Sequence, residues 1–137
     1  MRLTLSKTLT LMALGAALWF AAALFFRFGE QAGVVTGGHI WITDLALFPV
    51  TWPFVVLARK LVGAGPRDHT QIVAVATVTA LFLDGTAMAQ FPGLYGADLA
   101  TIQRDAAAIL WGAGVGLIIA LVMDQMAARA MSSSPSA

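Results

Sequence analysis

Cysteine is absent from the chain and charged residues are scarce. Because none of the 137 residues is Cys, disulfides, thiolate nucleophiles, iron–sulfur clusters and cysteine-based zinc sites are excluded. Charged residues make up 11% of the chain, whereas a soluble domain carries about 25% because its surface faces water. The net charge of +1 provides neither a basic field for nucleic acid nor an acidic tail. The composition therefore excludes an ordinary soluble domain and predicts no nucleic-acid partner.

Apolar residues are abundant instead. They make up 59% of the chain, whose mean hydropathy is +0.83. Uncharged stretches long enough to cross a bilayer as helices separate the charged positions. We therefore predict an all-α, polytopic membrane protein with four transmembrane helices in one bundle. The expected spans cover about residues 8–27, 40–58, 70–90 and 106–124 of a single domain, 1–130. Residues 131–137 have the composition of a disordered tail.

Three local features refine these spans. The first apolar run, Thr8 to Phe26, is longer than the roughly 7–15 residues of a signal-peptide core, so we expect it to remain as a span. Pro49 and Pro53 lie inside the second span and predict a kink, because proline removes a backbone donor and clashes with the preceding turn. Tyr95 follows the third span and is expected to anchor the chain at the membrane interface.

The distribution of Lys and Arg predicts the orientation. With four crossings, the amino end, the second loop and the carboxyl end lie on one side of the membrane. Positively charged residues favour the cytoplasmic side. That side would hold Arg2, Lys7, Arg59, Lys60, Arg67 and Arg129, and the opposite side Arg27 and Arg104. Both termini are therefore expected to be cytoplasmic.

Asp84 is the main candidate for chemistry, because it interrupts the third span about 20 Å from its start. Insertion scales give a cost of about 2.5–3.5 kcal/mol for a carboxylate near the centre of a membrane helix, so the side chain should face protein or a water-filled cavity. Ala76 and Ala80 precede it at four-residue spacing and form a narrow stripe that another helix can approach. Two interpretations remain: an ion or proton site, and a structural carboxylate that fixes helix register.

Three charged residues are predicted to lie in one leaflet: Arg27, Asp44 and Asp84. The topology places each of them towards the outer face of the membrane. An arginine between two carboxylates would bridge them through bidentate hydrogen bonds and lower their pKa values. Two carboxylates without the arginine would share a proton, as a carrier requires. Asp44 alone can also be explained as a helix-start residue beside the positive end of the helix dipole.

Stripes of small residues predict close helix contacts. The pattern Gly-x-x-x-Gly allows membrane helices to approach closely. It extends through the last span at four-residue spacing as Ala108, Gly112, Gly116 and Ala120, and the first span has a similar line at Ala13, Ala17 and Ala21. These stripes are expected to pack within the bundle, or to form a self-association face.

The remaining polar residues predict no catalytic machinery, cofactor or metal site. His39 and His69 fall in loops on opposite sides of the membrane, so they are not expected to share a metal ion or a haem. Serine is confined to Ser6 and the carboxyl tail, which leaves no buried serine nucleophile. We therefore expect that the protein is not an enzyme.

The second half of the chain carries a family resemblance. Leu83-Asp84-Gly85 is followed by Phe91-Pro92, by Tyr95 and by the run Ile109 to Gly112. This arrangement resembles small bacterial four-helix integral membrane proteins that are grouped as domains of unknown function. The resemblance implies a multi-pass protein of the bacterial inner membrane and implies no activity.

Two classes of function follow. The first is a structural or accessory membrane protein, or a subunit of a larger complex, whose intramembrane charges hold the helices together. The alternative is a small ion- or proton-coupled transporter or channel that uses Asp84, with Asp44, as its intramembrane carboxylate. The expected partners are the lipid bilayer and, on the lipid-facing surface, another membrane protein or a second copy of the chain.

Overall fold

The computed structural model describes residues 3–31, 40–95 and 98–133, with side chains for these ranges except residues 30, 31 and 40–44. Four α-helices and one short 3-10 helix make up this part of the chain. They are α1 (Leu5–Gln31), α2 (Ile40–Leu61), α3 (His69–Gln90), η1 (Pro92–Leu94) and α4 (Leu99–Ser132). The all-helical prediction is confirmed for the described residues.

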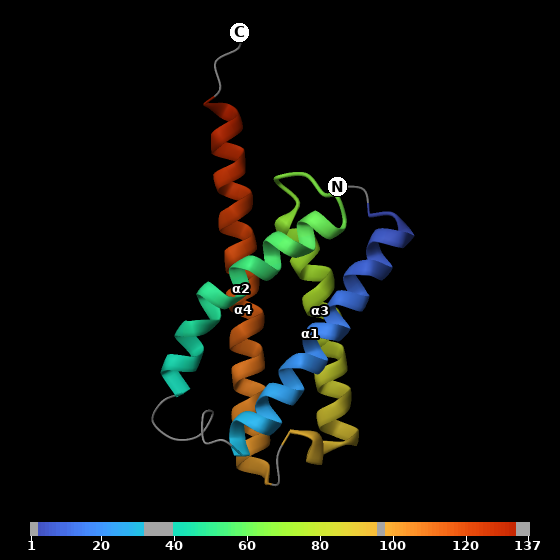
Figure 1. Ribbon diagram of the computed structural model, residues 1–137, viewed down its shortest axis with the longest axis vertical. Helices are drawn as coiled ribbons and strands as arrows, with labels where there is room; N and C mark the ends of the chain where they lie inside the picture. The colour runs from blue at the N-terminus through green and yellow to red at the C-terminus, as the bar shows by residue number, and fades with distance from the viewer. Residues whose placement is uncertain (1–2, 32–39, 96–97, 134–137) are drawn as a thin grey trace.

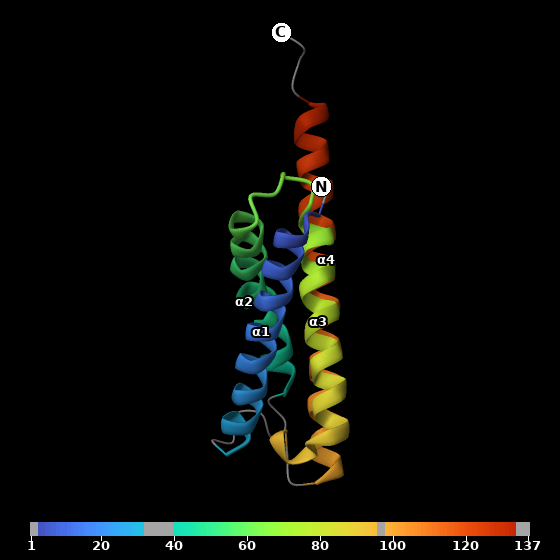
Figure 2. The same ribbon diagram turned by 90° about the vertical axis from the view of Figure 1, so that its right-hand side faces the viewer.

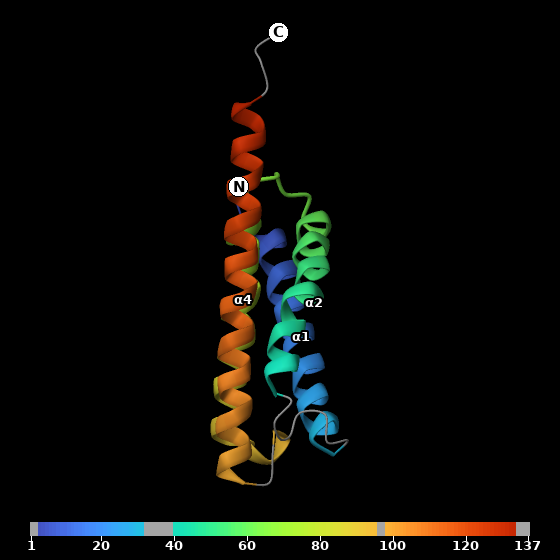
Figure 3. The same cartoon turned by 90° about the vertical axis from the view of Figure 1, so that its left-hand side faces the viewer.

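The helices lie side by side and alternate in direction (Figure 1). Figures 2 and 3 show two layers, with α1 and α2 in one and α3 and α4 in the other. Across the layers α1 packs mainly against α3, and α2 packs against α4 and α3. The ends of α1 and α2 that adjoin residues 32–39 therefore lie at the same end of the molecule as the turn between α3 and α4.

Local sequence explains where the helices end. Gly63 follows α2 with φ +56°, a left-handed conformation that favours glycine, and the amide of Ala64 then returns to the Arg59 carbonyl at 3.1 Å. Phe91 ends α3 because the residue before a proline is disfavoured in the α conformation, and Pro92 then opens η1. Asp98 begins α4 as its N-cap.

Closest approach between helices occurs where α1 crosses α3. A Cβ added at Gly15 would overlap the carbonyl oxygen of Ala76 and lie 3.1 Å from the Cα of that residue. Leu11 and Ala23 continue the same face of α1 into two buried clusters, one with Ile72 of α3 and one with Tyr95. Gly15 is thus the residue that allows α1 to touch the backbone of α3.

The described helices α1, α3 and α4 contain segments long and apolar enough to cross a membrane: Leu5–Gly29, His69–Gln90 and Leu99–Ser132. Large apolar side chains face outward on them, for example Phe20 at 54%, Phe82 at 74% and Leu110 at 64% exposure. These features identify a membrane-type helical protein, because a soluble surface would carry polar groups there.

Two helices differ from the predicted spans. α4 has 34 residues, about 51 Å at 1.5 Å per residue, and it extends beyond the other helices at its carboxyl end (Figure 1). It therefore includes residues 99–105, which precede the predicted span, and residues 131 and 132, expected in the disordered tail. α2 continues through Pro49 and Pro53, and its ribbon changes direction part-way along (Figure 1).

Candidate functional site

Asp84 lies in a buried hydrogen-bonded group that joins three segments of the chain. Tyr95, immediately after η1, donates its hydroxyl proton to Asp84 Oδ1 at 2.5 Å. The same hydroxyl oxygen accepts a hydrogen bond from Trp19 Nε1 of α1 at 2.9 Å. Asp84 is 6% and Tyr95 1% exposed. We call Trp19, Asp84 and Tyr95 the Tyr95 cluster; it links α1, α3 and the turn that leads to α4.

Tyr95 is therefore a core residue, and its buried side chain is not exposed to act as the predicted anchor. The tight turn at Pro92 brings the phenol back between α1 and α3, where it packs with Ala23 and Ala87. Burial raises the pKa of the Tyr95 hydroxyl above its usual range, the hydrogen bond to Asp84 raises it further, and the charge of buried Asp105 acts in the same direction. The phenol therefore remains a hydrogen-bond donor.

Two of the three residues predicted to form one polar cluster, Arg27 and Asp84, form no ion pair with each other. Asp84 bonds to Tyr95, whereas the Arg27 side chain near the end of α1 is exposed. The side chain of Asp44 lies outside the described residues. Within the described part of the chain, no cation forms an ion pair with Asp84, so its partners there are a phenol and, through it, an indole.

A second carboxylate, Asp124 of α4, caps the first turn of α3. Its Oδ1 accepts hydrogen bonds from the His69 amide at 2.9 Å and from His69 Nδ1 at 2.8 Å, and its Oδ2 accepts from the Thr70 amide at 2.9 Å. The carboxylate accepts and does not donate, so Nδ1 of the imidazole carries the proton. We call His69, Thr70 and Asp124 the Asp124 cluster.

This cluster exists because α3 lacks a cap of its own. The first amides of a helix have no partner within the helix, and an acceptor near that end is also favoured by the helix dipole. Asp68, the N-cap residue of α3, makes no capping hydrogen bond and instead accepts from the Gly65 amide at 2.9 Å. Asp124 supplies the missing acceptor from the neighbouring helix.

The sequence predicted that His69 lies in a loop, but His69 is the first residue of α3. Its side chain is buried, and Nε2 has no hydrogen-bond partner among the described residues. A buried polar atom without a partner costs about 1–3 kcal/mol. The ring is therefore held on one side and unsatisfied on the other.

The small-residue stripe of α4 lies on the side of that helix that contacts α2 and α3. A Cβ at Gly116 would lie 3.7 Å from Val73 and 3.8 Å from Thr51, and one at Gly112 would lie 3.6 Å from Leu47. Ala120 is fully buried and Ala108 half-buried.

The corresponding stripe predicted in α1 does not pack within the molecule. Ala13, Ala17 and Ala21 are exposed, and the contact with α3 is made by Leu11 and Gly15 on the opposite side. The sequence analysis identified only the line of Ala13, Ala17 and Ala21, because the face that contacts α3 contains Leu11 beside Gly15 and forms no continuous line of small residues.

Several functional candidates were missed, although the sequence contained a signal for one of them. Asp124 and His69 were both expected at the same membrane face, which made a pair between α3 and α4 available to sequence reasoning. Asp105 and Thr101 of α4 are buried as well, at 3% and 4% exposure. No pattern in the sequence distinguished them from residues of an exposed first turn.

The groups at these sites donate and accept hydrogen bonds, and the Tyr95 hydroxyl keeps its proton. Among the described residues, no group of three or more His, Cys, Asp or Glu side chains is arranged to hold a metal ion.

Comparisons with known protein families, with curated proteins and with solved structures found no match for this chain.

Proposed function

We propose that this chain is a structural or accessory membrane protein without catalytic machinery, which works through its apolar surface as a partner of another membrane protein. The observation that carries the proposal is how its membrane carboxylates are used. Asp84 is engaged by Tyr95, and Asp124 by the start of α3. Both carboxylates therefore join helices to one another, as expected of acids that maintain an arrangement of helices.

We further propose that α2 is a fourth span and that both ends of the chain are cytoplasmic, in the bacterial inner membrane. Support comes from the antiparallel order of the helices, in which α2 runs beside α4 (Figure 3). Its last turn carries Arg59 and Lys60, at the end of the molecule where α1 begins. Basic residues at that end agree with a cytoplasmic location.

The outer surface supports an accessory role. Exposed apolar side chains occur on every described helix, including Phe54 of α2 at 44% and Val78 of α3 at 66%. A bilayer covers such a surface, and helices of a partner protein or of a second copy can replace lipid there through close packing.

Transport through Asp84 is the second candidate, and one observation favours it. In the described part of the chain, the Asp84 carboxylate has no cationic partner. A buried acid that is not neutralised by a cation is able to take up a proton, which a proton-coupled carrier requires.

Proton flux separates the two candidates. Liposomes that contain the wild-type chain or Asp84→Asn and enclose a pH-sensitive dye are placed in an imposed pH gradient. The accessory role predicts that both dissipate the gradient no faster than protein-free liposomes. Flux that is present in the wild type and lost in Asp84→Asn would replace the accessory role by transport.

A double-mutant cycle tests the structural role of the same residue. Asp84→Asn is combined with Tyr95→Phe, and separately with Arg27→Gln as the matched control. Thermal unfolding in detergent should give a coupling of about 1 kcal/mol for the first pair, because both changes affect one hydrogen bond. The second pair should be additive. Coupling to Arg27 instead would restore the predicted ion pair.

A further inference from the structure

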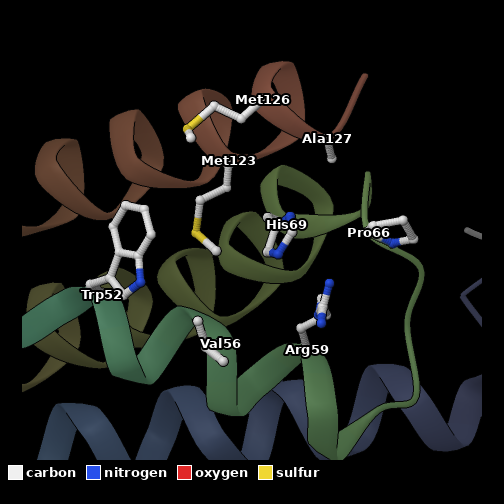
Figure 4. A pocket seen from close by; sticks show the side chains of 8 residues that line it. All are labelled: Trp52, Val56, Arg59, Pro66, His69, Met123, Met126 and Ala127. Atoms are coloured by element: carbon white, nitrogen blue, oxygen red, sulfur yellow. The ribbon is translucent and has the colours of Figure 1, made fainter. Parts of the chain in front are cut away.

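A pocket of about 210 Å³ opens between α2, the start of α3 and the carboxyl-terminal part of α4 (Figure 4). Much of its wall is apolar, with Trp52 on α2 and Met123 and Met126 on α4. Arg59 and His69 also line it, on neighbouring sides in Figure 4. The pocket thus combines apolar walls with a guanidinium and an imidazole.

The imidazole offers an unused acceptor. His69 is 2% exposed, and its Nδ1 donates to Asp124 at 2.8 Å. With Nδ1 as the donor to Asp124, the neutral form of the ring carries a lone pair on Nε2. That atom has no partner in the part of the chain that the structure describes. The most favourable addition is therefore a group that donates a hydrogen bond.

The guanidinium offers an unused positive charge. Arg59 is half-buried in the last turn of α2, and no described carboxylate forms an ion pair with it. The carboxylate of Asp124 is already engaged by three donors from His69 and Thr70. Lys60, the next residue along the helix, is exposed and does not line the pocket. The pocket is therefore suited to an anion.

A second, apolar groove of about 620 Å³ lies beside this pocket, between α2 and α4. Trp52 lines both, and the groove extends to Phe48 and Pro49 on α2 and to Ile118 and Val122 on α4. From Phe48 to Arg59 the helix rises about 16 Å. That is close to the thickness of one leaflet of a hydrocarbon core of about 30 Å. The groove has the length and character of a site for an acyl chain.

We propose that pocket and groove together bind one anionic phospholipid whose head group carries a hydroxyl, of the phosphatidylglycerol class. The phosphate accepts hydrogen bonds from Arg59, the hydroxyl donates to His69 Nε2, and an acyl chain lies along the groove. Met123 is flexible and unbranched, and its rotation gives the hydroxyl access to Nε2. The inference rests on the proposed function in one respect, that α2 crosses the membrane.

Lipid titration of the full chain in detergent, followed by native mass spectrometry, tests the site. The lipids are phosphatidylglycerol, phosphatidylethanol, which has the same charge without the hydroxyls, and zwitterionic phosphatidylcholine. Arg59→Gln should weaken phosphatidylglycerol binding about tenfold, the effect of losing a charge-assisted hydrogen bond. The matched control Lys60→Gln removes the same charge one residue away, outside the pocket, and should leave binding within about twofold.

His69→Asn separates the imidazole from the guanidinium. The asparagine amide keeps a donor for Asp124 and removes the atom that corresponds to Nε2. The variant should bind phosphatidylglycerol and phosphatidylethanol equally, whereas the wild type prefers phosphatidylglycerol. If the variant does not fold, the comparison of these two lipids on the wild-type chain provides the same test.

Three results would overturn the inference: equal binding of phosphatidylglycerol and phosphatidylcholine, equal losses in Arg59→Gln and Lys60→Gln, or no wild-type preference for the hydroxyl-bearing lipid. These binding results are distinct from a failure of the proposed function. That failure would appear as proton flux that depends on Asp84. An Ala64→Cys variant, reacted with a membrane-impermeant maleimide before and after membrane opening, reports separately on whether the loop after α2 is cytoplasmic.

Discussion

Each end of the helix bundle contains a carboxylate on an apolar helix, but different kinds of hydrogen-bond donor bind the two carboxylates. Asp84 bonds to the side chain of Tyr95, which in turn bonds to Trp19. Asp124 bonds to backbone amides at the start of α3 and to the imidazole of His69. The first cluster depends on aromatic side chains brought together by a turn. The second completes a helix that lacks its own cap.

Asp84 shows that a carboxylate on an apolar helix can be hydrogen-bonded without a described cation beside it. A phenol or the start of a neighbouring helix provides the donors that a buried carboxylate requires. His69, the partner of Asp124, lines a pocket, whereas the Tyr95 hydroxyl is already hydrogen-bonded to two side chains. For this reason the ligand site proposed above lies at the Asp124 end.

Separating α1 from α3 should disrupt the Tyr95 end most strongly. Gly15→Val places side-chain atoms where the Ala76 carbonyl lies, so the helices must move apart. We expect a loss of about 3 kcal/mol in the free energy of unfolding, at the upper end for overpacking. The Trp19 to Tyr95 bond should be lost and the bonds of Asp124 kept. Thermal unfolding in detergent measures the loss of stability, and hydrogen exchange in the first turn of α3 measures whether the bonds of Asp124 are kept.

Gly85→Ala is the matched control for that change. Gly85 is also in a membrane helix, α3, and nothing lies within 4 Å of a Cβ added there. Its unfolding temperature should equal or exceed that of the wild type, because alanine favours the helix. Equal destabilisation by the two variants would contradict the close α1–α3 crossing.

Removing the acceptor at the other end should have the next largest effect. Asp124→Ala leaves the first amides of α3 and His69 Nδ1 without their acceptor, at an expected cost of about 2 kcal/mol. Hydrogen exchange should rise in the first turn of α3 and remain unchanged around Tyr95.

Asp98→Ala provides the comparison for Asp124→Ala. Asp98 is the N-cap of α4 and accepts from the Thr101 amide at 2.9 Å within its own helix. Its removal should affect only the start of α4 and cost less than the loss of Asp124. A larger effect at Asp98 would mean that the contact between α3 and α4 does not depend on the Asp124 cap.

The smallest predicted effect is a loss of stability at alkaline pH that depends on Tyr95 and is absent at neutral pH. Its pKa is raised in the folded protein, so the stabilisation is fully present below the ordinary value of 10.0 and is lost as the pH rises above it. The expected slope is at most about 1.4 kcal/mol per pH unit, because the unfolded chain releases a proton that the folded chain retains.

Tyr95 is the single tyrosine of the chain, so the absorbance of tyrosinate reports on this residue alone. In the folded protein the absorbance should rise only well above pH 10.0, and in denaturant near that value. Tyr95→Phe should remove the corresponding alkaline loss of stability. Ionisation of the folded protein at the ordinary pKa would contradict the burial of the hydroxyl.

Much of the secondary structure was predictable, because it depends on local sequence. The apolar stretches placed all four helices, and Pro92 marked the end of α3. The burial of Asp84 was also predictable, since a carboxylate is costly in lipid. The partner of Asp84 was not, because the topology brings Arg27 to the same end of the bundle as Tyr95.

Only the positions of the helices relative to one another distinguish such alternatives. A rotation of α1 decides whether Gly15 or the line of Ala13, Ala17 and Ala21 meets α3, and both faces contain small residues. Likewise, the predicted topology places His69 and Asp124 at the same end of the bundle, but only the packing of α3 against α4 decides that their side chains meet.

The sequence by itself determined a membrane-type chain of apolar helices with acids that must avoid lipid, because hydropathy and the cost of an exposed carboxylate act residue by residue. The tertiary structure decided which donors those acids meet, that Tyr95 is buried, and that Arg59 and His69 share a pocket. Those outcomes depend on helix rotation and crossing, which bring together residues distant in sequence, and the pattern along one helix does not specify either.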